Sequence, residues 1–224
     1  MEFARGYVVK KVSFKKVPIF PPAAVRSVQT AAILPDIATE AVRKSLHFLI
    51  ALAPAIARLS YPLAILALAA GVLAYSVMEG LRLSGVNVPL VSALTSMASR
   101  QRDAGRFALG PVTLGIGALL ALLLFPFNAA VIGILALAFG DGFAGLFGKL
   151  GKIRPAFLFG KSIEGSFACF AATFLSALFV SKNVSLSLAA ALAATAVEAL
   201  PLEDYDNIAL PLAVGAVVML GMPA

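Results

Sequence analysis

The sequence predicts an all-α integral membrane protein, built as a bundle of about seven transmembrane helices. The chain of 224 residues is 61% hydrophobic and only 13% charged, and its mean hydropathy is +0.97. A soluble domain would alternate polar and apolar faces, whereas the runs at 112–125 and 129–139 read as apolar on every side. At about 20 residues per crossing, the chain has room for six or seven helices.

Composition divides the chain into two domains, a basic arm at 1–45 and a polytopic membrane domain at 46–224. The arm carries lysines and arginines among four prolines, so we expect it to lie on an anionic lipid surface. The membrane domain contains seven apolar segments, at 46–59, 61–80, 109–125, 127–147, 163–181, 185–200 and 207–222. The first segment is short and contains Pro54, which predicts a tilted or partial crossing.

The charged residues orient this bundle. With a cytoplasmic amino terminus, 16 lysines and arginines fall in inside segments, whereas only Arg58 and Lys182 fall outside. This is the positive-inside distribution, and it places the carboxyl terminus outside. The membrane surface or an anionic cytosolic substrate explains the net charge of +7, and no module typical of nucleic-acid binding is present.

The acidic residues also map to the inside ends of the segments. A transporter would distribute polar groups along a path near the middle of the bilayer. Clustering at one interface instead favours an enzyme with its active site at the cytosolic face, acting on a cytosolic reagent and a lipid. The acidic residues in question are Glu40, Glu79, Asp103, Asp141, Glu164, Glu198, Glu203, Asp204 and Asp206.

Asp141 lies near the end of the fourth apolar segment, between Gly140 and Gly142. With Gly145 these glycines spell G-x-G-x-x-G, but a dinucleotide fingerprint follows a strand, and this one ends a membrane helix. Glycines spaced three apart also allow close helix packing. Packing leaves Asp141 unexplained, because a carboxylate in an apolar helix is costly unless it is paired, metal-bound or wetted. We therefore expect Asp141 to bind a metal ion or a metal–phosphate group.

The stretch Gly160–Lys161–Ser162 resembles the end of a P-loop, but that motif needs a glycine where this chain has Pro155. What remains is Lys161 with the hydroxyls of Ser162 and Ser166 at the start of a helix near residue 163. Such a helix start binds anions. The alternative is a lysine that only anchors the helix at the interface.

Two charged clusters accompany other segments. Arg43, Lys44 and His47 share one helical face with Glu40, either as a membrane anchor or as part of the site. His47 could be structural or catalytic. Glu79 and Arg82 are three residues apart, which fits a helix-stabilising ion pair as well as a functional one.

Three further candidates lie near helix ends. Arg106 precedes Gly110–Pro111 and could contact either a triphosphate or a lipid headgroup. Glu198 could complete a divalent-metal site with Asp141. Asp206 and Asn207 begin the last segment and could instead cap its helix.

These motifs, in this order, resemble the CTP-dependent lipid-alcohol kinases, the family of dolichol kinase, phytol kinase and the CTP-using diacylglycerol kinase. The resemblance covers residues 40–212. It is carried by RKSLH at 43–47, EGLR at 79–82, GP at 110–111, GDGFAGLFG at 140–148, FGKSIEGS at 159–166, and E-x-L-P at 198–201 followed by DNIALP at 206–211.

The resemblance implies a nucleotide site formed by Gly140, Asp141, Gly142, Lys161, Glu164, Gly165 and Ser166, and marks Asp206 and Asn207 as family positions. Arg43, Lys44, Arg82, Arg106, Gly145 and Ser162 complete the expected nucleotide contacts. The implied reaction transfers the γ-phosphoryl group of CTP to the hydroxyl of a polyprenol-type alcohol (dolichol, polyprenol or phytol), with Mg²⁺ or another divalent cation.

In this reaction Asp141 and Glu198 would hold the metal, Lys161 the phosphate, and Glu79 or His47 would accept the alcohol proton. A CTP-dependent diacylglycerol kinase is the nearest alternative. A CDP-alcohol phosphotransferase would continue D-G-x-x-A-R, whereas Phe-Ala-Gly-Leu follows Asp141–Gly142 here. A non-enzymatic membrane transporter would bind no nucleotide.

Overall fold

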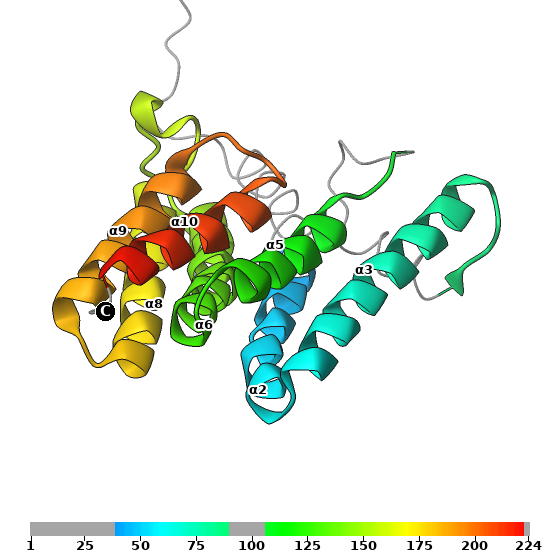
Figure 1. Ribbon diagram of the computed structural model, residues 1–224. Helices are drawn as coiled ribbons and strands as arrows, with labels where there is room; N and C mark the ends of the chain where they lie inside the picture. The colour runs from blue at the N-terminus through cyan, green and yellow to red at the C-terminus, as the bar shows by residue number, and fades with distance from the viewer. Residues whose placement is uncertain (1–38, 90–105, 222–224) are drawn as a thin grey trace, which may run out of the picture. The chain divides into compact units, whose positions relative to one another are not determined.

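The computed structural model describes residues 39–89 and 106–221, and within these ranges every regular element is a helix (Figure 1). The predicted all-α class is thus confirmed for this part of the chain. Most of the basic arm, at 1–38, lies outside the described residues, as does the segment 90–105. The described helix 39–50 begins inside the segment assigned to the arm, so Glu40, Arg43 and Lys44 belong to the helical domain.

The first predicted crossing, 46–59, consists of two helical pieces rather than one. The helix 39–50 ends at a turn on Ala51, and α2 (Leu52–Leu59) follows. Pro54 explains the break, because it has no N–H and its ring would clash with the carbonyl of residue 50 in a continuous helix. In the first turn of α2 the same proline is tolerated. Ser60 then adopts an extended conformation, and α3 (Tyr61–Leu83) begins.

The central part of the chain contains α5 (Gly110–Leu124), α6 (Phe127–Leu135), the π-helix η2 (Ala136–Asp141) and α7 (Gly142–Leu150). The predicted segment 127–147 is therefore one continuous helical run that contains a π-helical turn. π-Helical turns are rare and frequently mark functional sites. Asp141 is the last residue of this turn.

The last part begins with a 3-10 turn, η3 (Ala156–Leu158), followed by α8 (Ile163–Ser181), α9 (Val184–Ala199) and α10 (Asp206–Gly221). Two of these helices have side-chain caps at their starts. The Ser162 side chain accepts from the N–H of Gly165, and that of Asn183 accepts from the N–H of Leu186. These caps fix the helix starts within a residue of the predicted segments.

Helices α6 and η2 form the centre of the core, in contact with α5, α8 and α10. Half of their buried apolar side chains are alanines, which allows close approach of the neighbouring helices. These side chains are Ala129, Ala130, Val131, Ile132, Ile134, Ala136, Leu137 and Ala138. Helix α10 comes so close to α5 that a Cβ atom at Gly117 would collide with the carbonyl oxygen of Asn207. Because Pro211 has no N–H to donate to that carbonyl four residues earlier, the first turn of α10 lacks one helical hydrogen bond.

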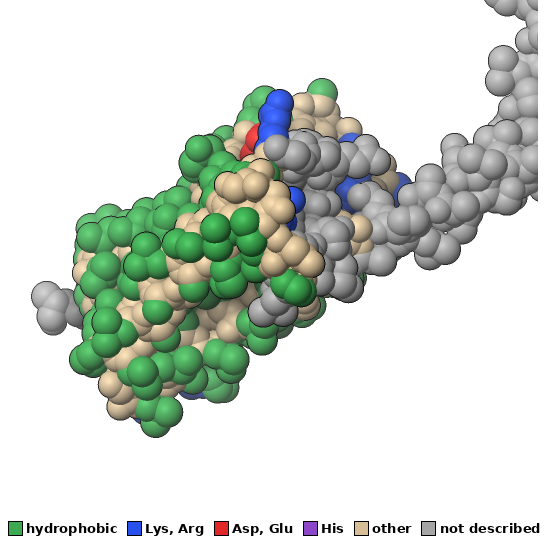
Figure 2. Space-filling view, turned by 90° about the vertical axis from the view of Figure 1, so that its right-hand side faces the viewer, with side chains coloured by type: hydrophobic (Ala, Val, Ile, Leu, Met, Phe, Trp, Pro, Cys, Tyr) green, Lys and Arg blue, Asp and Glu red, His purple; other side chains and the backbone are tan. Residues whose placement is uncertain are grey.

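Three helical runs are long and apolar enough to cross a membrane: Tyr61–Leu83, Phe127–Leu150 and Ile163–Ser181. Gly110–Leu124, Val184–Ala199 and Asp206–Gly221 are shorter apolar helices. Large apolar side chains on α3 are exposed, among them Leu66, Leu73 and Val77. Hydrophobic side chains also spread over much of the described surface in Figure 2, whereas most of its charged side chains lie toward the upper end of that view.

Candidate functional site

The centre of the candidate site is a buried ion pair between Lys44 and Asp141. Lys44 Nζ donates to Oδ2 of Asp141 at 2.5 Å. Lys44 is 2% exposed and Asp141 5% exposed, so the two opposite charges are paired away from bulk solvent. A buried carboxylate of this kind is tolerated because it is paired.

Two glycines of α7 make this contact possible. A Cβ atom at Gly145 would collide with Cε of Lys44 and would lie 2.5 Å from Oε1 of Glu40. At Gly142 it would lie 2.6 Å from Cε1 of Phe48, whose ring also contacts those of Phe139 and Phe143. The expected contribution of these glycines to helix packing is therefore confirmed, and its result is that Lys44 reaches Asp141.

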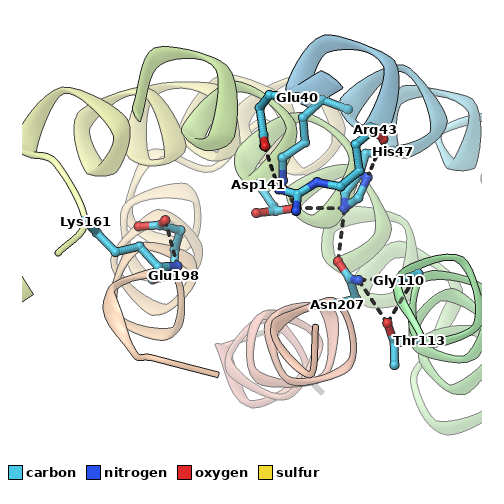
Figure 3. Close-up of polar contacts among 10 residues, drawn as sticks. Glu40, Arg43, His47, Gly110, Thr113, Asp141, Lys161, Glu198 and Asn207 are labelled. Atoms are coloured by element: carbon cyan, nitrogen blue, oxygen red, sulfur yellow. Dashed lines mark hydrogen bonds and ion pairs between the residues drawn. The ribbon is translucent and has the colours of Figure 1, made fainter. Parts of the chain in front are cut away.

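His47 lies against the same carboxylate, one helical turn after Lys44. Its Nε2 atom is 2.9 Å from Oδ2 of Asp141 and 3.0 Å from Oδ1 of Asn207, and its Nδ1 atom is 3.1 Å from the carbonyl oxygen of Arg43 (Figure 3). Arg43 itself pairs with Glu40 at 2.6 Å. The four residues 40, 43, 44 and 47 thus act from one helical face, as the sequence predicts, with two of them on Asp141.

Asn207 connects His47 to the start of α5. Its Nδ2 atom donates to Oγ1 of Thr113 at 3.0 Å and is 3.4 Å from the carbonyl oxygen of Gly110 (Figure 3). The alternative prediction for Asn207, a cap for its own helix, is not what its side chain does. Thr113 was missed at the sequence level, because the run 112–125 reads as apolar; its hydroxyl is the signal that could have identified it.

Glu79 and Arg82 form the predicted ion pair at the end of α3. Arg82 donates Nε and Nη2 to the two carboxylate oxygens of Glu79, each at 2.8 Å. Glu79 is fully buried and also accepts from the backbone N–H of Ala108 at 3.0 Å. Arg82 in turn contacts the carbonyl oxygen of Arg106. This cluster therefore holds the chain that leads into Gly110, where α5 begins.

A second cluster joins the start of α8 to the end of α9. Lys161 Nζ lies 3.0 Å from Oε1 of Glu198 and also bonds to the Glu198 carbonyl oxygen (Figure 3). The hydroxyl of Ser166 is 3.4 Å from Oε2 of Glu198. Glu198 is buried, so the predicted phosphate-binding lysine is held in place by the carboxylate predicted as a metal ligand.

The loop before α8 closes on its own helix start. Glu164 Oε1 accepts from the backbone N–H groups of Lys152 and Ile153, at 2.9 and 3.3 Å. Gly165 packs on Gly148 of α7, where a Cβ atom would lie 3.0 Å from the Gly148 Cα. Glu164 and Gly165 thus shape the loop, and the Ser162 side chain caps the helix at the position expected for an anion site.

Asp206 lies one residue before the predicted crossing at 207–222 and is half-buried. Burial, and then the nearby Asp141 carboxylate, raise the pKa of Asp206 to about 7, against the opposing effect of Lys44, Lys161 and Arg43. Asp206 is therefore within electrostatic reach of both Asp141 and Lys161.

The predicted metal ligands Asp141 and Glu198 are each engaged by a lysine. Among residues 39–89 and 106–221, no group of three or more histidine, cysteine, aspartate or glutamate side chains is arranged to hold a metal ion. Both contacts of Asp141 fall on Oδ2, and its Oδ1 atom takes no hydrogen bond or ion pair from another described residue. A carboxylate oxygen of this kind is a ligand that suits Mg²⁺, which usually keeps several waters and takes few protein ligands.

Comparisons with known proteins identify no relative: no family model, curated protein or solved structure matches the chain. The site combines a buried carboxylate, one oxygen of which takes no bond from residues 39–89 or 106–221, with cations from three segments and a capped helix start, all next to apolar helices.

Proposed function

We propose that this chain is a membrane lipid kinase that transfers the γ-phosphoryl group of CTP to the hydroxyl of a polyprenol-type alcohol. One observation carries the proposal: segments that resemble the kinase family, at 43–47, 140–148 and 206–211, meet at Asp141 through Lys44, His47 and Asn207. Lys44 and His47 contact the Asp141 carboxylate directly, and Asn207, 160 positions after His47, joins it through His47. The choice of CTP over another nucleoside triphosphate as the donor rests on the family resemblance.

The charges of the site suit phosphoryl transfer, which mainly requires positioning and charge neutralisation. Asp141 would hold Mg²⁺ through Oδ1, and the ion would neutralise the triphosphate charge. Lys161 and the Ser162-capped start of α8 are placed to bind phosphate oxygens. Lys44 balances the buried Asp141 carboxylate, so the site starts close to neutral before the anionic nucleotide enters.

Glu79 and His47, the two expected proton acceptors, make contacts that differ from those of a free base. Glu79 already accepts N–H groups from Arg82 and Ala108, and His47 Nε2 faces two oxygen atoms. These contacts favour a structural role for both residues next to the site.

We further propose that all seven apolar segments cross or enter the bilayer, with the amino terminus and the site cytosolic and the carboxyl terminus outside. The contacts favour this arrangement. Asn207 at the start of α10 meets the start of α5, and Ala108 before α5 meets the end of α3. A lipid alcohol would reach the site with its tail among the helices and its hydroxyl at headgroup depth.

The direct test is a transfer assay with the purified full-length protein in detergent. γ-Labelled CTP or ATP is offered with Mg²⁺ and a panel of polyprenol, dolichol, phytol and diacylglycerol. Label in a polyprenol-type alcohol supports the proposal, and label only in diacylglycerol supports the alternative kinase. Absence of label in every combination, with a folded protein, would exclude a kinase and favour a transporter or another non-enzymatic role.

A further inference from the structure

Four buried polar side chains form a continuous chain of hydrogen bonds that crosses the candidate site. It runs from Thr113 of α5 to Asn207 of α10, then to His47 and finally to Asp141, with successive distances of 3.0, 3.0 and 2.9 Å. All four residues are at most 5% exposed. Buried networks of this kind specify one arrangement, because any group left without a partner is costly.

The contacts of Asn207 with α5 determine which groups donate and which accept along this chain of hydrogen bonds. The carbonyl oxygen of Gly110 can only accept, so the Asn207 group that faces it is the NH₂ group. The amide oxygen of Asn207 must then face His47. Since Oδ1 of Asn207 and Oδ2 of Asp141 are both acceptors, the N–H on His47 Nε2 donates toward them, and the carbonyl oxygen of Arg43 is likewise an acceptor that faces Nδ1.

At the other end of the hydrogen-bond chain, the two carboxylate oxygens of Asp141 have different contacts. Oδ2 accepts from Lys44 and from His47, whereas Oδ1 is engaged by neither. A carboxylate held by two donors on one oxygen cannot rotate without losing both. The network therefore determines which oxygen atom of Asp141 faces an incoming ligand.

We propose that Thr113 and Asn207 are positioning residues that hold the His47 Nε2–H on Oδ2 of Asp141 and so present Oδ1 to the ligand. The identity of that ligand, a divalent cation with its nucleotide, rests on the proposed function. The positioning itself does not, since it can be observed on His47. Partners of this indirect kind typically affect activity by about 10- to 100-fold.

The chain offers a direct reporter, because His47 is its single histidine. Full-length protein without a polyhistidine tag, labelled with ¹⁵N-histidine, gives one imidazole in an NMR spectrum. We expect the wild-type spectrum to show a protonated Nε2. Asn207→Leu should shift the Nε2 resonance, Thr113→Val should shift it in the same direction to a smaller extent, and Thr113→Ser should keep it at the wild-type position.

Thr195→Val is the matched control. The Thr195 hydroxyl donates to the carbonyl of Ala191 within α9, at 2.7 Å, and has no contact with the chain of hydrogen bonds. In the transfer assay, Asn207→Leu should lower kcat by about 10-fold with little change in KM for the alcohol, and Thr195→Val should leave both unchanged.

The positioning proposal is overturned if Thr113→Val and Asn207→Leu leave the His47 resonances at their wild-type positions, or if Thr195→Val shifts them equally. Failure of Asn207→Leu to fold leaves the Thr113→Val and Thr113→Ser pair to decide. A wild-type protein that transfers no phosphoryl group, but shows the expected shifts, refutes the kinase and retains the positioning role.

Discussion

Lys44 Nζ lies 2.5 Å from Oδ2 of Asp141, although 97 positions separate the two residues in the chain. The pair joins the helix 39–50 to the end of η2, and both partners are buried. Removing one partner therefore leaves an uncompensated charge in an apolar surrounding, whereas removing both leaves none.

This relationship predicts a double-mutant result. Lys44→Met and Asp141→Asn should each destabilise the protein, by about 3–5 kcal/mol, and the double variant should be more stable than either single one. Thermal unfolding in detergent measures the three midpoints. All three variants should lack phosphoryl transfer, so the comparison separates stability from activity. If the double variant is no more stable than the less stable of the two single variants, the two charges do not depend on each other.

Gly145→Ala in α7 should disrupt the same ion pair, because the new methyl group would collide with Cε of Lys44. We expect a lower unfolding midpoint and a strong loss of transfer. Gly71→Ala, also inside a helix, is the control: nothing lies within 4 Å of its Cβ position, so it should be neutral or stabilise by about 0.5–1 kcal/mol. Equal effects at the two positions would contradict the close contact.

Lys161→Met and Glu198→Gln should raise KM for the nucleotide by about 10-fold and leave KM for the alcohol almost unchanged. The reason is that Lys161 is placed at the start of α8 to meet phosphate, and Glu198 holds it there. Steady-state kinetics with each substrate varied in turn measures this. The exposed Lys152 belongs to the same loop, and Lys152→Met should leave both constants near wild type. A matching rise for Lys152→Met would indicate only a general charge effect.

The raised pKa of Asp206 predicts a pH-dependent stability. In the unfolded chain this carboxyl ionises near its ordinary value of 3.8, but in the folded protein only near 7. Its contribution is therefore complete below about pH 4 and is lost as the pH rises to about 7, by up to about 4 kcal/mol. Asp206→Asn removes this loss, so its gain in unfolding midpoint over wild type should be larger at pH 8 than at pH 5. A gain that is independent of pH would show that Asp206 ionises normally.

The proposed topology can be tested by cysteine labelling. Cys169 is fully buried, so the wild-type protein should not react with a maleimide reagent in intact membranes. In a Cys169→Ala background, Ser84→Cys after α3 should react only from the cytosolic side. Asn183→Cys, between α8 and α9, should react only from the outside. Reaction of both positions from one side would refute the seven-crossing arrangement.

The helices of this protein could be predicted because an apolar run and its polar ends are local properties of the sequence. Ile163–Ser181 is found where the apolar segment predicted it, with Ser162 as the cap. The break at Ala51 follows from Pro54 in the same local way. The ion pair of Glu79 and Arg82 could be predicted from their spacing of three residues, and the two side chains do pair.

The site could be predicted only in part, because its contacts join distant segments. Asp141 stood out as a costly carboxylate, but nothing local indicates that Lys44 and His47 would pair with it. Asn207 contacts His47 across 160 positions, a pairing that helix periodicity cannot supply. Thr113 was hidden by its apolar neighbours, and its importance depends on how closely α10 approaches α5 at Gly117.

The π-helical turn Ala136–Asp141 has a consequence for how such a site can arise. A π-helical turn holds about one residue more than an α-helical one, and each residue rotates an α-helix by about 100°. An inserted residue would rotate the rest of an ordinary α-helix by that amount, whereas a π-helical turn absorbs it and keeps Asp141, and the glycines after it, directed toward Lys44. Deleting one residue between 136 and 140 would return the turn to the α-helical form and leave the glycines of α7 on the face that meets Lys44.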